Sequence, residues 1–452
     1  MSFTWDESQT FQVYVNNGVF IDSVFSRMSA NNHWLNTWLM ILMSKMVGAK
    51  EFFLRLPNLL SYLIFMYFSA RIIADIQHKI LAVCFFVMIN LNPYLLDFFC
   101  LARGYGLAMA FMMGSLFYAY VYVSKNSTIR FAFYSLLFAA ISVISQMTLL
   151  NYFFALLTIL FVIHFQRTFI HEKRLFFKNT MLLLLIPFVL LAFIVPLILQ
   201  LQNAKAFFYG GDSGFWKDTV NSLIYSTLYE HSYSFFTQLI VKVFILFVLL
   251  SSSIIAVQYL RGKKSMSNPP FLFVLLFILF FSVMIIYANH QLFGIKFLIQ
   301  RTGLFYIPLF NLTVVFLFHT FTLKKKSYQG ISFLVAIFVI MNFIHTMNLN
   351  YVLEWKLDAD TRNMMKDVEK MYELKKENIT IWTEKGFDTP MDFYRITRHL
   401  NWLTVVNATS ILDNKNEFYY GTKEGMINFT NDSLVIVKEY PVTKSVLAVS
   451  NH

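Results

Sequence analysis

The chain has 452 residues, of which 57% are hydrophobic and 14% charged, with a mean hydropathy of +0.57. Soluble domains carry about 25% charged residues, so this composition excludes an ordinary soluble protein and indicates a membrane protein. The net charge of +12 does not predict a nucleic-acid partner, because most Lys and Arg lie in short loops between apolar runs, where they report membrane topology.

A polar head, residues 1–56, opens the chain. It contains two adjacent carboxylates in Trp5-Asp6-Glu7 and the polar run Asn31-Asn32-His33. Residues 34–48 are apolar but too short to cross a bilayer, and they predict an interfacial helix.

Apolar runs of about 17 to 24 residues follow, each long enough to cross a hydrocarbon core of about 30 Å. We place spans at 57–74, 78–95, 104–123, 129–146, 149–165, 181–201, 237–260, 271–288, 303–322 and 330–347. The spans 129–146 and 149–165 form a tight hairpin around Gln146-Met147-Thr148. The sequence therefore predicts an all-α polytopic membrane protein with about ten transmembrane helices.

Basic residues divide unevenly between alternate loops. Five lie in one set of loops, and they are Arg103, Lys205, Lys217, Lys296 and Arg301. Fourteen lie in the alternate set, at 71–79, 124–130, 166–180, 261–264 and 323–328. By the positive-inside rule the richer set is cytoplasmic, so the head, the poorer set and the tail are expected to face outward. An outward N-terminus without a preceding span predicts either a short translocated tail or a further helix upstream.

The tail, residues 348–452, is denser in charge and predicts a small α/β domain. Expected helices are 358–374 and 391–400, and expected strands are 378–382, 403–406, 417–420 and 434–437. The predicted division is therefore an outward first loop with an interfacial helix (1–56), a transmembrane bundle (57–347) and an extracytoplasmic α/β domain (348–452). The tail contains no catalytic motif, and a structural or recognition role is the simpler interpretation.

The order of several short motifs resembles the GT-C superfamily of integral-membrane glycosyltransferases, in the branch of protein O-mannosyltransferases and the bacterial aminoarabinose transferase. The motifs are Trp5-Asp6-Glu7, Asn31-Asn32-His33 with Leu35-Asn36-Thr37, Leu54-Arg55-Leu56-Pro57-Asn58, Leu101-Ala102-Arg103-Gly104-Tyr105-Gly106 and Arg301-Thr302-Gly303-Leu304-Phe305. The resemblance implies a GT-C-like fold, a sugar donor carried on a polyprenyl phosphate and transfer with inversion. It also implies an acidic residue in the first outward loop as general base.

Asp6 is the first candidate for this base, and Glu7 is the second. A carboxylate beside a membrane can have its pKa raised toward the working pH, where base catalysis is efficient. From the residue pattern alone, two carboxylates that only solvate a loop are the simpler interpretation, and the resemblance is what implies catalysis. The pair could also hold a divalent cation as a cofactor, but two carboxylates are too few to assign a metal site.

Outward cations at the mouths of spans are candidates for binding the donor phosphate. Arg103 and Arg301 come first, because the guanidinium fork can bind two phosphate oxygens, and Lys296 and His290 come next. Fixed positive charge would stabilise the leaving phosphate as its negative charge develops. The alternative is that these arginines only reach lipid head groups. Arg55 is interpreted as structural.

Three further outward residues are candidates for positioning the acceptor or a loop, namely Asn32, His33 and Asp97. Asp97 can pair with Arg103, six residues later, or act as a second acid. Glu51, four residues from Arg55, is the expected partner of that arginine. The loop 203–236 contains Tyr209-Gly210-Gly211-Asp212-Ser213-Gly214-Phe215-Trp216. This run predicts either a mobile flap over a sugar or an ordinary interfacial loop.

The predicted function is sugar transfer from a polyprenyl-phosphate donor to a glycan, lipid or protein acceptor at the outer face of a bacterial inner membrane. A transporter or flippase of lipid-linked sugars is the alternative from another class, although such proteins usually show repeats and broken spans in matching halves. A polymerase of lipid-linked glycans would use the same phosphate-binding cations. A scaffold would explain the spans but not the placement of carboxylates and arginines.

Overall fold

The computed structural model describes residues 1–21, 30–169, 172–229, 235–262, 270–324, 329–407, 418–427 and 434–450. By its internal contacts the chain forms two compact units. The terminal unit comprises Met1–Ile21, Thr37–Leu56 and Asn348–His452, and the membrane unit comprises Asp22–Asn36 and Pro57–Met347.

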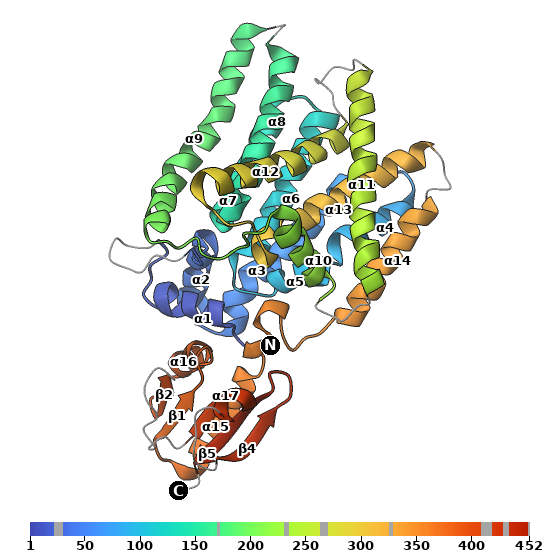
Figure 1. The fold of residues 1–452 in the computed structure, drawn as a ribbon. Coiled ribbons are helices and arrows are strands. Elements are labelled where there is room, and N and C mark those ends of the chain that lie inside the picture. Colours follow the sequence, from blue (N-terminus) through green and yellow to red (C-terminus); the bar gives the residue numbers. More distant parts are fainter. Residues whose placement is uncertain are drawn as a thin grey trace. The chain divides into compact units, whose positions relative to one another are not determined.

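Long apolar helices build the membrane unit (Figure 1). They are α3 (Glu51–Ile73), α4 (Lys79–Asn90), α5 (Pro93–Phe99), α6 (Gly104–Ser124), α7 (Ile129–Ser145), α8 (Leu150–Thr168), α9 (Lys173–Asn203), α10 (Asn221–Thr227), α11 (Phe235–Arg261), α12 (Phe271–Phe293), α13 (Tyr306–Lys324) and α14 (Gln329–Thr346). Short helical turns lie between them: η2 (Met147–Leu149), η3 (Trp216–Val220) and η4 (Gln300–Gly303).

Among the described residues, 8 helices are long and apolar enough to cross a membrane, or up to 9 if the bent pair α4 and α5 is one span. The shorter apolar helix α7 adds a further segment. The predicted all-α polytopic architecture is confirmed, and the chain is an integral membrane protein.

The predicted span boundaries are wrong in three places. The helix α3 begins at Glu51, before the predicted 57, and continues through Pro57. The helix α9 begins at Lys173, so the basic residues of the predicted loop lie in its first turns. The predicted span 78–95 bends by 64° between α4 and α5. At that bend Asn92 caps α5 by accepting the N–H of Leu95, and Pro93 takes the first helical position, a combination that starts a new helix.

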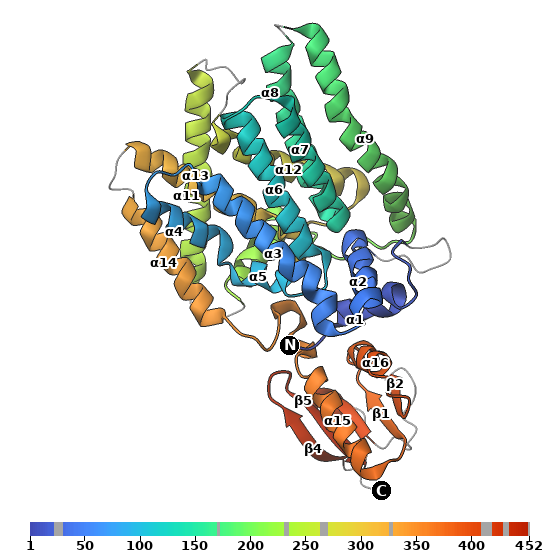
Figure 2. The same cartoon turned by 180° about the vertical axis from the view of Figure 1, so that it is seen from behind.

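The helix α6 is the most enclosed of the candidate spans, with 89% of its apolar window buried, against 11% for α11. Figures 1 and 2 both show α6 inside the bundle, beside α3 and α7. Alanine and glycine are frequent in the first half of α6, and small side chains let neighbouring helices approach closely. The N-terminal end of α6 is therefore held firmly by its surroundings.

The terminal unit combines short N-terminal helices with an α/β fold. Its elements are α1 (Trp5–Thr10), η1 (Phe11–Val15), most of α2 (Trp34–Val47), η6 (Leu353–Asp358), α15 (Thr361–Lys375), β1 (Ile379–Thr383), α16 (Asp388–Thr397), β2 (Leu403–Asn407), β3 (Phe418–Thr422), α17 (Lys423–Ile427), β4 (Leu434–Tyr440) and β5 (Ser445–Ser450). The helix α2 confirms the predicted helix at 34–48 and is not among the candidate spans. Its interfacial position stays a prediction.

The sheet has the strand order β2-β1-β3-β5-β4. The strand β1 runs parallel to β2 and β3, whereas β5 is antiparallel to both β3 and β4. Figures 1 and 2 show α15 on one face of this sheet. Trp382, Tyr419, Val446 and Ala448 form a buried cluster on it. The predicted α/β tail is confirmed, but β5 was not predicted; in the sheet it lies between β3 and β4, which correspond to two predicted strands.

Candidate functional site

The N-terminal residues of the terminal unit are attached to its C-terminal part. Ser2 Oγ donates to the carbonyl of Ala359 at 2.6 Å, and the N–H of Phe3 donates to the hydroxyl of Tyr394 at 2.9 Å. The ring of Phe3 also stacks on Phe393, with centroids 4.0 Å apart. These contacts place α1, which carries the predicted catalytic pair, against the α/β fold.

Glu7 is fully buried and engaged on both oxygens. Arg55 Nε donates to Oε1 at 2.8 Å, and Arg55 Nη2 donates to Oε2 at 2.5 Å. Glu7 also closes a capping box with Thr4, whose N–H donates to the Glu7 carboxylate at 2.9 Å. The expected partner of Arg55, Glu51, lies 3.5 Å from Arg362. Arg55 therefore has a structural contact, as expected, but its partner is Glu7 of the motif Trp5-Asp6-Glu7 and not the expected Glu51.

Asp6 is also buried, with 4% of its surface exposed. Another carboxyl, Asp358 at the end of η6, accepts the N–H of Trp5 at 2.6 Å. Burial, together with the charges of Asp6 and Glu7, raises the pKa of Asp358 to about 7, although the bond from Trp5 opposes this shift. The terminal unit therefore holds three neighbouring carboxyl groups, of which Glu7 is ion-paired and Asp358 was not predicted.

In the membrane unit, the loops predicted to lie on the same side meet around Arg103. Its guanidinium is fully buried at the start of α6 and donates from Nη2 to Asn31 Oδ1. His33 Nδ1 lies 3.2 Å from the carbonyl of Ser145, which identifies Nδ1 as the donor, because a carbonyl only accepts. The polar head, the N-terminal end of α6 and the C-terminal end of α7 thus contribute to one cluster.

Arg301 lies close enough to this cluster to act on the charge of His33. The pKa of His33 lies well below its usual value, and burial is the largest cause. The positive charges of Arg103 and Arg301 lower this pKa further, whereas the hydrogen bond with the Gln146 side chain raises it. The imidazole of His33 is therefore neutral at pH 7. Two predicted phosphate-binding arginines and one predicted positioning histidine are brought together here.

The backbone beside Arg301 is strained. Gln300 has a φ of 46°, in the left-handed region that non-glycine residues seldom adopt. Its N–H donates to Ser222 Oγ at 3.0 Å, and its Oε1 accepts the Tyr209 hydroxyl at 2.7 Å. The guanidinium of Arg301 lies 4.4 Å from the centre of the Tyr209 ring. Such over-determined strain is typical of functional sites.

A chain of amides orients the start of α6. Asn36 Nδ2 donates to the carbonyl of Ala102 at 2.8 Å, and Asn58 Nδ2 donates to Asn36 Oδ1 at 2.6 Å. The Oδ1 of Asn58 in turn accepts the N–H of Leu107 at 3.3 Å. At Gly104, an added Cβ would lie 2.0 Å from the carbonyl oxygen of Ser145. Only glycine therefore allows the hairpin after α7 to lie this close to Arg103.

The predicted flap is fastened to the loop before α13. Gly211 and Phe297 exchange two backbone hydrogen bonds, of 3.0 and 2.8 Å. Lys296 pairs with Asp212 at 2.8 Å in an exposed ion pair, and His290 Nδ1 lies 3.0 Å from the carbonyl of Ile295. The phosphate-binding roles of Lys296 and His290 stay predictions.

Asp97 lies in α5 and accepts the hydroxyl of Tyr229 on both oxygens, at 3.1 and 3.0 Å. Asn32 is buried beside His33. The positioning roles of both residues stay predictions. Across the part of the chain that the structure describes, no group of three or more His, Cys, Asp or Glu side chains could hold a metal ion.

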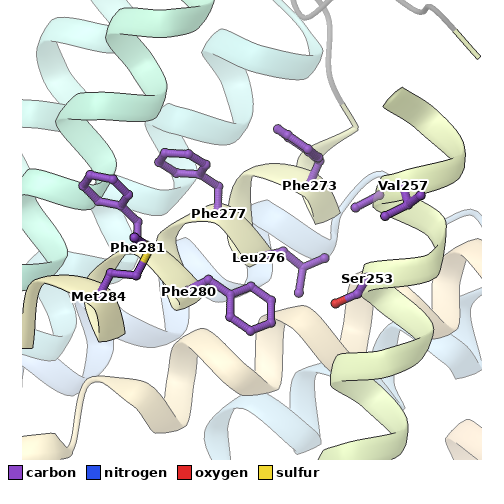
Figure 3. Close-up of a pocket in the computed structure, with 9 residues that line it drawn as sticks. Ser253, Val257, Phe273, Leu276, Phe277, Phe280, Phe281 and Met284 are labelled. Atoms are coloured by element: carbon purple, nitrogen blue, oxygen red, sulfur yellow. The ribbon is translucent and has the colours of Figure 1, made fainter. Parts of the chain in front are cut away.

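An apolar cavity of about 290 Å³ lies between α11 and α12. Figure 3 shows Leu276 and Phe280 of α12 pointing toward Ser253 and Val257 of α11. Its lining is almost wholly hydrocarbon, so this cavity suits an apolar chain and not a sugar.

Five polar residues of these clusters were given no site role of their own from the sequence, namely Gln146, Tyr209, Gln300, Asn58 and Asp358. Gln146 and Tyr209 lie in loops that the charge rule had already placed on the same side as Arg103 and Arg301, and this common side was the signal that could have found them. Asp358 carried no local signal, because its partner Trp5 lies 353 positions away.

No family model matches the chain, and no curated protein matches it. Among solved structures, the chain is similar to the crystal structure of ArnT from Cupriavidus metallidurans bound to undecaprenyl phosphate. The TM-score is 0.48 and the sequence identity is 8%, and the similarity covers 91% of this chain and 86% of that chain. Similarity at this level does not assign a family or an activity to the chain.

Proposed function

We propose that the chain is a membrane glycosyltransferase that moves a sugar from a polyprenyl-phosphate donor to an acceptor at the outer face of a bacterial inner membrane, with inversion. The observation that supports this proposal is that Arg103, at the N-terminal end of α6, and Arg301 both lie close enough to the neutral, buried His33 to act on its charge. The motif order that resembles the GT-C superfamily supports the same reading.

The arginines would bind the phosphate of the donor. Two guanidinium groups near a helix N-terminus favour an anion, because the fork of donors and the helix dipole act in the same direction. A neutral imidazole fits beside them, since it adds hydrogen-bonding capacity without further positive charge. As the bond between the sugar and the phosphate oxygen breaks, the electron pair leaves with the phosphate, where these fixed charges stabilise it.

Asp6 would take the proton of the acceptor hydroxyl while its oxygen forms the new bond to the sugar. Glu7 is less suited to this task, because Arg55 and the capping box occupy its carboxylate. In this proposal, Glu7 is a brace that holds the turn, and Asp6 is the base.

The apolar chain of the donor would lie along the spans. The cavity between α11 and α12 is lined by α12 as far as Met284. From Met284 to His290, α12 rises by about 9 Å at 1.5 Å per residue, and the loop to Arg301 follows. The proposal therefore links an apolar cavity to a cationic loop through a single helix.

The test is transfer of label from a radiolabelled polyprenyl-phosphate sugar in membranes that contain the native chain or a variant. Asp6→Asn should abolish transfer, and Arg301→Gln should lower it by about 10²-fold or more. Arg395→Gln, which removes a charge from a partly exposed ion pair with Asp392, is the matched control and should transfer normally. Full transfer by Asp6→Asn would refute the base, and no transfer by the native chain with a panel of sugars would refute the activity.

Transport of a lipid-linked sugar is the second candidate, and the broken span at Asn92-Pro93 favours it, because transporters place broken helices at their substrate sites. Transporters usually have such breaks in both halves, and one bent pair is found in the described part of this chain. Movement of a labelled lipid-linked sugar across proteoliposomes without chemical transfer would establish this alternative.

A further inference from the structure

The first turn of α1 is completed by the C-terminal part of the chain. The first N–H groups of a helix have no partner within the helix and must find one elsewhere. Thr4 Oγ1 accepts the N–H of Glu7 at 3.4 Å, and Asp358 Oδ2 accepts the N–H of Trp5 at 2.6 Å. Asp358 is 5% exposed, so water does not readily replace it.

Other contacts fix the same segment on both sides of this bond. Ser2 Oγ donates to Ala359, accepts the N–H of Arg362 at 3.0 Å, and so ties the residue before α1 to the start of α15. At the far end, Gln12 Nε2 donates to the carbonyl of Thr389 at 2.8 Å. Asp358 is the contact that acts on the residue adjacent to Asp6.

We propose that Asp358 is a positioning residue for the candidate base: by accepting the N–H of Trp5, it fixes the direction in which Asp6 leaves the first turn of α1. This inference rests on the proposed function, and it gives the C-terminal α/β fold a part in sugar transfer. Asp358 would not itself exchange a proton with the substrate.

The acceptor oxygen of Asp358 matters in this role, and its negative charge does not. Asp6 and Glu7 face it from α1, with Glu7 held by Arg55, and burial favours the uncharged carboxyl. Of the cations near it in sequence, Lys356 lies over the ring of Tyr351, 5.0 Å from the ring centre, and Arg362 lies 3.5 Å from Glu51. An amide of the same shape therefore preserves the bond to Trp5, whereas a methyl group removes it.

The experiment compares Asp358→Ala, Asp358→Asn and the control Asp360→Ala in the full-length chain, by steady-state transfer in detergent or membranes. Asp360 is equally buried and two residues away, but it accepts the N–H and hydroxyl of Thr443, inside the α/β fold. The Asp360→Ala variant therefore shows how much activity is lost when a buried contact within the α/β fold is removed while the bond from Trp5 to Asp358 is kept.

Asp358→Ala should lower kcat by about 10- to 100-fold, the cost of a misplaced catalytic group, while the KM for the donor changes by less than about threefold. Asp358→Asn should restore kcat to within about threefold of the native value, and Asp360→Ala should stay close to it. Equal loss in the Ala and Asn variants would overturn the proposal, because it would make Asp358 a chemical group. Native kcat in folded Asp358→Ala would overturn it as well.

A second readout does not depend on activity. Amide hydrogen exchange of residues 5–10 should become about tenfold faster or more in Asp358→Ala, and should stay near native in Asp358→Asn. If the native chain transfers no sugar but this pattern appears, the proposed function fails while the contact stands. If exchange is unchanged in Asp358→Ala, the contact itself does not hold α1, and the inference fails.

Discussion

The ion pair between Glu7 and Arg55 allows a test of whether Glu7 has only a structural role or acts as the general base. Both side chains are buried, and the guanidinium donates twice to the carboxylate. Arg55→Met keeps most of the side-chain volume but leaves the charge of Glu7 buried without its partner. Removing one member of a buried pair costs about 3–5 kcal/mol, because the remaining charge stays desolvated.

The double variant Glu7→Gln/Arg55→Met removes both charges, and it should recover much of this loss, to within roughly 1–2 kcal/mol of the native protein. Thermal unfolding of the full chain in detergent, followed by a probe in the terminal unit, measures the two values. The sugar-transfer assay is then run on the double variant, which should keep measurable activity if Glu7 only braces the turn. Asp6→Asn, by contrast, should be inactive.

Two results would refute this reasoning. An Arg55→Met variant as stable as the native protein would mean that the pair is not buried in the folded state. A double variant that is stable but wholly inactive would place Glu7 in the chemistry, and the roles of Asp6 and Glu7 would have to be exchanged.

The remaining predictions concern a close contact, an exposed pair and a pH profile. Gly104→Ala should lower the free energy of unfolding by about 1–3 kcal/mol, and with it the unfolding temperature, since its Cβ would overlap a backbone oxygen. The control Gly330→Ala, with open space around it, should not lower the unfolding temperature. Lys296→Ala should leave the unfolding temperature nearly unchanged, because an exposed ion pair contributes about 0–1 kcal/mol; a clear drop would show that this pair supports the loop. The pKa of Asp358 is raised to about 7, so the folded state holds a proton that the unfolded state loses near pH 4. Its contribution to stability therefore falls as pH rises from about 4 to 7, by up to about 4 kcal/mol, and the unfolding temperature of Asp358→Asn should fall less than that of the native chain between pH 5 and pH 8.

The spans could be predicted because a long apolar run is a local property. The side of the membrane that each loop faces stays a prediction from the distribution of basic residues. The break within 78–95 could also have been predicted, since Asn92 followed by Pro93 is a helix-starting signal. Hydropathy alone does not reveal it, because the residues on both sides of the break are apolar. The strand β5 was missed because its identity as a strand depends on pairing with β3 and β4 on either side. Pairing of this kind depends on distant sequence.

The candidate site divides in the same way. Arg103 and Arg301 were predicted because each is a cation at the end of a span in a loop expected to face outward, and the structure places both close enough to act on the charge of His33. Their phosphate-binding role stays a prediction. The partners of the acidic pair could not be found by spacing. Arg55 lies 48 positions from Glu7, and Asp358 lies 353 from Trp5, distances at which no helical or strand period relates two residues.

The contacts between the two ends of the chain also set an order of assembly. The bond from Ser2 to Ala359 joins residues 357 positions apart, and that from Phe3 to Tyr394 joins residues 391 apart. At synthesis rates of about 5–20 residues per second, the N-terminal segment waits roughly 20 to 70 seconds for these partners. All the spans leave the ribosome in that interval, so α1 can take its final place only after the bundle has been inserted. A nascent chain arrested just before residue 358 would contain the candidate spans of the described residues and both arginines, yet would lack the carboxyl that accepts the N–H of Trp5.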